Sequence, residues 1–185
     1  MADISAEAFM DHNDPIGNFI FGDEPNRRVL SKRFFRALVT SCSPKVLRLA
    51  TSPEMEAISI WFPPGLGHED DVDADPFKPE DFTQPDTLKK MQAVSDVITA
   101  LTAELGHEPQ WYLHLLAVRT KCSDKGHCSA LLEPVFARAK AEGLPCTLIT
   151  QSMQNALKYG HWGFRVIKEM TVPDSRETFY SMRRD

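Results

Sequence analysis

Residues 111–166 read WYLHLLAVRTKCSDKGHCSALLEPVFARAKAEGLPCTLITQSMQNALKYGHWGFRV, and this stretch decides the fold. It begins with a nearly continuous apolar run from Trp111 to Val118, which favours a central strand covered on both faces. After a polar loop, apolar residues recur three or four positions apart from Leu131 to Ala139. This spacing predicts a helix that ends at Gly143.

The rest of the stretch predicts a strand, a helix and a strand. Cys146 to Thr150 has the composition of a short buried strand, and Asn155 to His161 that of a short helix. Phe164 to Met170 and Thr178 to Met182 are then expected to pair as the last two strands.

Upstream, three helices and two strands are expected. The helices are Asp3 to Phe9, which Asp14-Pro15 would help to end, Asn26 to Thr40, and Thr87 to Leu105; the strands are Lys45 to Ala50 and Glu56 to Phe62. This order predicts an α/β fold (an α+β mixed sheet), in which helices flank a central mixed β-sheet.

Composition limits the classes of function. The chain has 185 residues, of which 42% are hydrophobic and 25% charged, so we expect one globular domain over residues 1–185. A net charge of -5 argues against a nucleic-acid partner. No apolar run is long enough to cross a bilayer, and the N-terminus lacks a signal pattern, so we expect no membrane partner and a cytoplasmic location.

The polar loop after the central strand has a physical use. A strand that turns into a helix through a loop containing a glycine, here Gly126, directs several backbone N–H groups at one point. The helix dipole makes that point attractive to an anion such as a pyrophosphate.

Residues 111–166 resemble three successive motifs of the GCN5-related N-acetyltransferase (GNAT) family, in the family's order. The segments RRVLSKRFFRAL (27–38) and AISIWFPPG (57–65) are similar to its small-molecule-acetylating branch. The resemblance implies transfer of an acetyl group from acetyl-CoA, the cosubstrate, to a small-molecule amine by direct attack in a ternary complex. Family members begin with a strand before the first helix, and its absence here would leave a sheet edge open for a homodimer.

The resemblance also implies a set of coenzyme-binding residues. The family's phosphate loop has Gln or Arg, two residues, Gly, one residue, then Gly or Ala, and only Gly126 fits this pattern here. Backbone donors of the loop would hold the pyrophosphate, and those of the central strand the pantetheine arm. The residues implied are Ser123, Asp124, Lys125, Gly126, His127, Cys128 and Ser129 in the loop, Leu116, Ala117 and Val118 in the strand, and Asn155 through its side chain. The negative Asp124 and the larger Cys128 would weaken coenzyme binding.

Two residues are expected to move protons. Tyr159 matches the family tyrosine that protonates the departing thiolate, a role that suits a phenol. His114 is a candidate base for the amine proton, because alternation places it on the same face as Leu116 and Val118. The alternative is a histidine hydrogen-bonded in a half-buried sheet; Glu56, Glu108 and the acidic loop 68–81 are further candidates for the base.

Three alternative interpretations depend on the residues of the loop after the central strand. The cysteines form no C-x-x-C pair, and a site built from Cys122, His127 and Cys128 matches no common metal spacing, so we expect no metal. Residues 126–130 have the letters of a nucleophile elbow, but about seven residues separate them from the strand, and an elbow needs an abrupt turn. The altered loop also fits a non-catalytic or repurposed GNAT-fold protein that binds a ligand or partner, or that catalyses another reaction.

Overall fold

The structure is a computed structural model, and it describes the chain except for residues 10–13, 41–42, 52–54, 67–76 and 123–124. Its centre is a six-stranded sheet in the order β1-β2-β3-β4-β6-β5. The strands are β1 Leu47–Thr51, β2 Ala57–Phe62, β3 Trp111–Val118, β4 Cys146–Gln151, β5 Arg165–Thr171 and β6 Thr178–Arg184. The helices are α1 Ala2–Phe9, α2 Pro15–Phe21, α3 Arg27–Thr40, α4 Thr87–Glu104, α5 His127–Glu142 and α6 Met153–His161.

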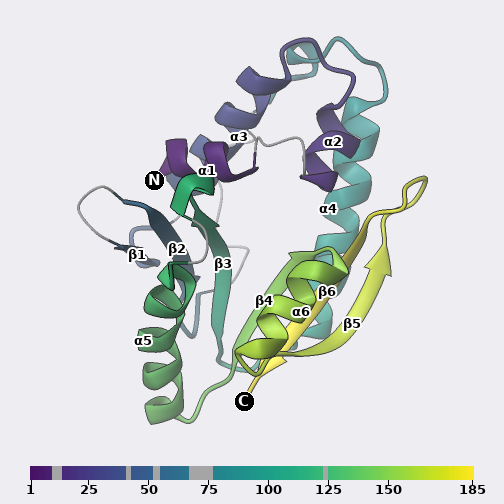
Figure 1. The fold of residues 1–185 in the computed structure, drawn as a ribbon. Helices are drawn as coiled ribbons and strands as arrows, with labels where there is room; N and C mark the ends of the chain where they lie inside the picture. Colours follow the sequence, from purple (N-terminus) through teal and green to yellow (C-terminus); the bar gives the residue numbers. More distant parts are fainter. Residues whose placement is uncertain (10–13, 41–42, 52–54, 67–76, 123–124) are drawn as a thin grey trace.

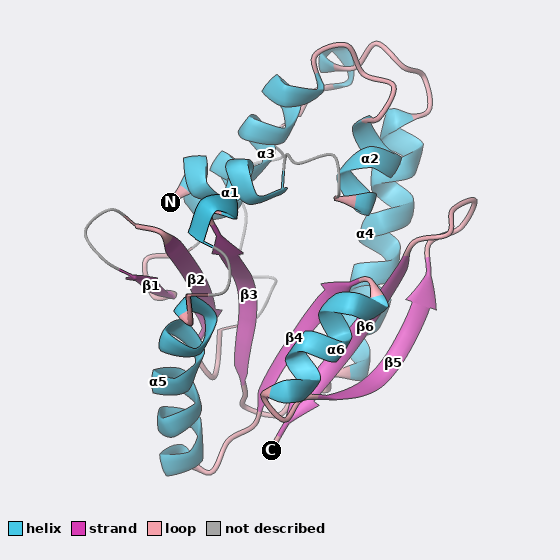
Figure 2. Ribbon diagram, in the orientation of Figure 1, coloured by secondary structure: helices cyan, strands magenta, loops and turns pink. Residues whose placement is uncertain are grey.

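The expected mixed sheet flanked by helices is confirmed (Figure 2). Only β3 and β4 pair in parallel; the other neighbours are antiparallel. Within the described residues no strand precedes α1, and β1 pairs only with β2, so β1 forms an edge of the sheet.

The sequence did not predict α2. Asp14-Pro15 was expected to end the first helix, but it starts a new one. Asp14 is the N-cap of α2 and accepts a hydrogen bond from the backbone N–H of Gly17 at 3.1 Å, while Pro15 occupies the first helical position.

Helices cover both faces of the sheet (Figure 1). On one face, α5 and α6 share a core with strand residues that include Trp61, Leu113 and Met182. On the other face, α1 and α3 pack on β2 and β3, and α2 and α4 pack on β5 and β6. Within the described part of the chain, no helix is both long and apolar enough to span a membrane.

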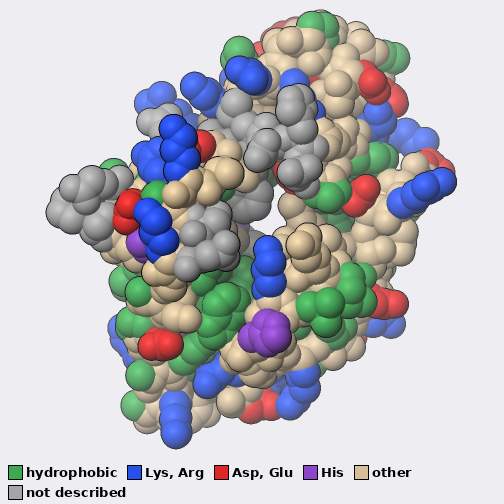
Figure 3. Space-filling view, in the orientation of Figure 1, with side chains coloured by type: hydrophobic (Ala, Val, Ile, Leu, Met, Phe, Trp, Pro, Cys, Tyr) green, Lys and Arg blue, Asp and Glu red, His purple; other side chains and the backbone are tan. Residues whose placement is uncertain are grey.

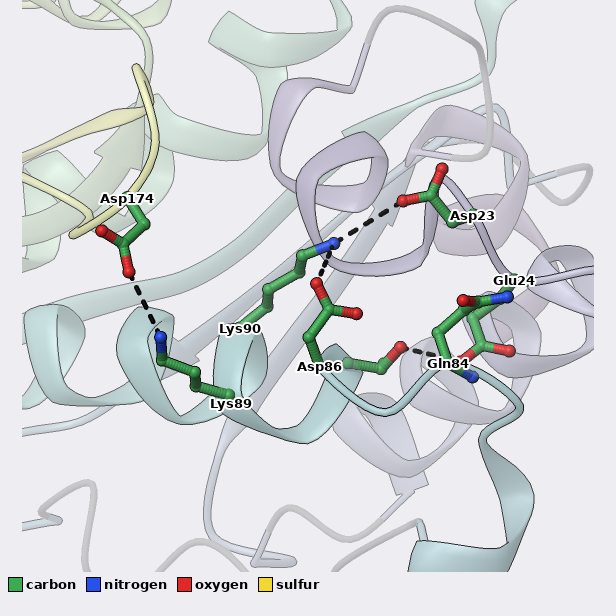
Figure 4. Close-up of polar contacts among 8 residues, drawn as sticks. Asp23, Glu24, Gln84, Asp86, Lys89, Lys90 and Asp174 are labelled. Atoms are coloured by element: carbon green, nitrogen blue, oxygen red, sulfur yellow. Dashed lines mark hydrogen bonds and ion pairs between the residues drawn. The ribbon is translucent and has the colours of Figure 1, made fainter.

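A buried carboxylate ties the connection between α2 and α3 to the start of α4. Glu24 is 4% exposed, and its oxygens accept four hydrogen bonds, from the backbone and hydroxyl of Thr83, the backbone of Gln84 and the hydroxyl of Thr87. Burial alone would raise the pKa of Glu24, but the four bonds together lower it to about 2. Nearby, Lys90 lies between Asp23 and Asp86, at 3.7 and 3.0 Å (Figure 4).

Candidate active site

The two central strands separate along their length. β3 and β4 pair at only three positions, from Trp111 with Cys146 to Leu113 with Leu148. Beyond them β3 pairs only with β2, and β4 only with β6, within the described residues. We call the paired part the closed end and the remainder, His114–Val118 and Ile149–Gln151, the open end. Figure 3 shows the surface hollowed between the two halves of the sheet.

The open end exposes one backbone edge of each strand. Because backbone N–H and C=O groups need partners, the edge of β3 that faces β4 can bind an extended chain of amides. Leu116, Ala117 and Val118 lie on this segment, where the sequence placed the pantetheine arm.

A β-bulge changes the direction of His114. Opposite β2, Ile60 pairs with Leu115 while Trp61 pairs with Leu113, so His114 is the extra residue of β3. Its ring lies 4.8 Å from that of Phe62, which belongs to the core under α1 and α3. Leu116 packs in the core under α5. The expectation from simple alternation, that His114 shares a face with Leu116, is therefore wrong.

The loop before α5 forms the expected anion-binding geometry in its described part. Gly126 precedes the helix with φ 77°, a left-handed conformation that favours glycine, and a Cβ at this position would meet no atom within 4 Å. The N–H groups of His127, Cys128 and Ser129 belong to the first turn of α5, where no intrahelical acceptor exists. Ser123 and Asp124 lie outside the described residues.

The helix α6 brings Tyr159 close to the start of α5. Its ring packs 6.0 Å from that of Trp162, whose indole N–H donates to the Ser129 hydroxyl at 3.2 Å. Burial and the nearby Cys128 thiol raise the pKa of Tyr159, so its phenol remains protonated at neutral pH. Asn155 is half-buried in the first turn of the same helix, and its N–H donates to the Ser152 cap at 3.3 Å.

The structure brings together Glu56, Cys122 and His127, three residues near the loop before α5 that the sequence did not group. Sγ of Cys122 donates to one Glu56 oxygen at 3.3 Å, and Nε2 of His127 lies 3.4 Å from the other. The sequence had placed Cys128, not Glu56, with this pair. Glu108, another candidate base, instead lies 3.5 Å from Arg183 in an exposed position.

Asp14 is a carboxylate at the open end that sequence reasoning missed. The side-chain amide of Gln151, the last residue of β4, donates from Nε2 to Oδ1 of Asp14 at 2.7 Å. Burial raises the pKa of Asp14 despite its hydrogen bonds from Gln151 and Gly17. The signal was present, because Asp before Pro is a common helix start, but it was read as a helix stop.

Comparisons with known proteins agree with this geometry. No protein-family profile matches the chain. A stretch of 54 residues is 39% identical to an uncharacterized N-acetyltransferase of Schizosaccharomyces pombe; this is 29% of the chain but only 22% of that protein's length.

Among solved structures, a Corynebacterium glutamicum protein described as histone acetyltransferase HPA2 and related acetyltransferase is similar over 99% of this chain and 87% of its own, with TM-score 0.62 and 20% identity. A protein assigned as arylalkylamine N-acetyltransferase 7 of the mosquito Aedes aegypti is similar over 100% of this chain and 82% of its own, with TM-score 0.60 and 13% identity.

The chain therefore has the GNAT acetyltransferase fold, which confirms the resemblance drawn from the sequence at the level of the fold.

Proposed function

We propose that this protein is an acetyl-CoA-dependent N-acetyltransferase that acts on a small-molecule amine by direct transfer in a ternary complex. The observation that carries the proposal is the early separation of β3 and β4 beside the glycine-led start of α5. This arrangement offers, side by side, a backbone edge for an amide chain and an anion site for a pyrophosphate.

Each part of the coenzyme then has a partner. The first-turn N–H groups of α5 hold the pyrophosphate, with Lys125 adding a positive charge. The open edge at Leu116, Ala117 and Val118 binds the pantetheine arm, and the side chain of Asn155 contacts the coenzyme. A backbone N–H near the β3 bulge polarises the thioester carbonyl, because a bulge interrupts the pairing with β2.

Tyr159 protonates the thiolate that leaves. A phenol carries its proton at neutral pH and can donate it as negative charge develops on sulfur; burial, which raises the pKa of Tyr159, makes the phenol a weaker acid than a free tyrosine. The tyrosine packs against Trp162, and Trp162 is bonded to Ser129 in the first turn of α5, so the proton donor is fixed relative to the phosphate site.

His114 and Asp14 are the two candidates for the base that takes the amine proton. The bulge directs His114 towards the face covered by α1 and α3, and Asp14 lies at the end of β4 through its bond with Gln151. Asp14→Asn removes the carboxylate base and His114→Gln the imidazole. The variant that abolishes the rise of kcat/KM with pH identifies the base.

The amine is expected to enter beside α2. An open groove of about 750 Å³ lies between Pro15, Asn18 and Phe19 of α2 and the turn from Asp174 to Glu177. Arg176 also lines the groove, and Asp174 pairs with Lys89 at 3.4 Å, so Glu177 is the carboxylate proposed to attract an ammonium group.

The test is an assay that measures release of free CoA thiol with a panel of amines. The panel includes arylalkylamines and a histone peptide, since the names of two structural neighbours mention these acceptors. We expect Tyr159→Phe to lower kcat roughly hundredfold and to leave the Kd of acetyl-CoA within about twofold.

Tyr180→Phe is the matched control, because Tyr180 is a buried tyrosine of the same core, and its turnover should be unchanged. Equal turnover of Tyr159→Phe and the native protein would remove the assigned role. Acetyl transfer only to the peptide would exclude the small-molecule acceptor, and no transfer to any amine would favour a repurposed fold.

A further inference from the structure

We propose that Glu56, Cys122 and His127 form a binding site for a zinc-like transition-metal ion beside the start of α5. One ligand atom from each residue lies within 4.8 Å of the other two. The site adjoins the coenzyme groove at His127, whose side chain would bind the ion while its backbone N–H belongs to the phosphate site.

The spacing of the three side chains is close to that of a tetrahedral site. Bonds of about 2.0 to 2.3 Å from zinc to O, N and S place two ligand atoms roughly 3.3 to 3.6 Å apart at a tetrahedral angle. The contacts present are 3.3 Å from Sγ of Cys122 to Oε1 of Glu56 and 3.4 Å from Nε2 of His127 to Oε2 of the same carboxylate, so a small turn of the carboxylate would present one oxygen to both partners.

The three residues are held by separate, hydrogen-bonded segments. The Glu56 carbonyl, just before β2, accepts from the N–H of Arg119 at 2.9 Å. The N–H of Cys122 donates to the Arg119 carbonyl at 2.8 Å, and His127 is the first residue of α5. The ligands therefore do not need a large rearrangement to bind an ion, which lowers the cost of binding.

One buried polar atom of the cluster lacks a hydrogen-bond partner among the described residues. Nε2 of His127 is shielded from solvent and makes no hydrogen bond of normal geometry in the described part of the chain, although a Glu56 oxygen is nearby. Buried polar atoms of this kind are rare, and a bound ion would satisfy this one.

The chemistry of the set selects the ion. A thiolate, an imidazole and a carboxylate suit Zn²⁺ or Co²⁺, whereas Mg²⁺ and Ca²⁺ prefer oxygen ligands alone. Binding replaces the Cys122 proton, which is released to solvent, and the thiolate and carboxylate then balance the two charges of the ion. Two cations, Lys125 and Arg119, act on Cys122, and Arg119 forms an ion pair with Glu7. Three protein ligands leave one position for water, and the ion would fasten the turn before β2 to the start of α5.

The experiment is a titration of the metal-free full chain with Co²⁺ and, in competition with a chromophoric chelator, with Zn²⁺. We expect one ion per chain, visible Co²⁺ bands of tetrahedral intensity, and a near-ultraviolet band from thiolate to Co²⁺. Cys122→Ser should remove the ultraviolet band and weaken Zn²⁺ binding roughly hundredfold or more.

Cys146→Ser and Cys128→Ser are matched controls and should keep both the band and the affinity, since neither cysteine belongs to the cluster. If Cys122→Ser does not fold, Glu56→Gln provides the second test, and it should weaken Zn²⁺ binding roughly tenfold or more. The absence of a thiolate band in the native protein, or full affinity in Cys122→Ser or Glu56→Gln, would overturn the proposal. These readouts do not depend on acetyl transfer.

Discussion

The closed and open ends of the β3–β4 pair differ in what they contribute. At the closed end, Trp111 and Leu113 are 1% and 3% exposed, and both strands are hydrogen-bonded to each other. At the open end, Leu115 and Ala117 are similarly buried, at 6% and 3% exposed, but the backbone edge on the side of β4 has no strand partner within the described residues. The same strand therefore provides stability at one end and a binding edge at the other.

The difference shows how a sheet can hold a ligand without losing its stability. Strands of a sheet normally pair along their length, because an unpaired backbone is costly when it is buried. Here the separated ends are spanned by α3, α2 and α4 (Figure 1), and the carboxylate of Glu24 fastens this connection to α4. The opening is thus bounded by strand pairing at one side and by helices at the other.

The largest effect is expected from breaking the closed end. Leu113→Ala should lower the free energy of unfolding by about 3 to 5 kcal/mol, because it leaves a cavity in a tightly packed core. The matched change at the open end, Leu116→Ala, should cost only about 1 to 2 kcal/mol, because that side chain is half-exposed. Urea unfolding of both variants measures the difference, and equal losses would show that the packing of Leu113 at the closed end contributes no more than that of the half-buried Leu116.

A smaller effect is expected at the helical side of the opening. Glu24→Gln should lower the free energy of unfolding at neutral pH by about 2 kcal/mol, because it removes the charge that strengthens four hydrogen bonds. The folded-state pKa of about 2 lies below the ordinary 4.5, so this stabilisation is complete above pH 4.5 and disappears as the pH falls towards 2.

Unfolding curves recorded between neutral pH and pH 2 measure this dependence. The difference between the native protein and Glu24→Gln should shrink over that range, whereas Glu133→Gln, on the exposed side of α5, should behave as the native protein throughout. A difference that stays constant with pH would show that the Glu24 charge is not its cause.

The smallest effect on stability is expected from the glycine at the phosphate site. Gly126→Ala should cost about 1 kcal/mol, because φ is 77° at this position, and Gly65→Ala should cost about the same at φ 83°. Only Gly126→Ala should also weaken acetyl-CoA binding, by roughly fivefold or more, since the new methyl group lies where the phosphate approaches the backbone. Equal acetyl-CoA affinity in the two variants would show that the phosphate does not bind at this turn.

The sequence predicted most of the fold because its signals were local. The apolar run from Trp111 to Val118 identified β3, and the spacing of apolar residues identified α4 and α5. The helix α2 was missed because its seven residues are too few to show a helical period. The bulge at His114 depends on the register between β2 and β3, which alternation within one strand cannot show.

The candidate site was less accessible to sequence reasoning for a similar reason. Gly126 and Tyr159 carried local or motif signals, and both lie at the start of α5 or close to it. Glu56 lies 66 positions before Cys122, and only the pairing of β2 with β3 brings the two together. Asp14 reaches Gln151 across 137 positions, so no local pattern links them.

Calorimetric titration of the purified chain with acetyl-CoA tests the central claim most directly, namely that the open end and the start of α5 form a coenzyme site. We predict one acetyl-CoA per chain with a Kd of roughly micromolar order, and similar binding of CoA, because the backbone donors remain despite the altered loop. No saturable binding at roughly millimolar coenzyme would contradict it and would show that this opening serves another ligand.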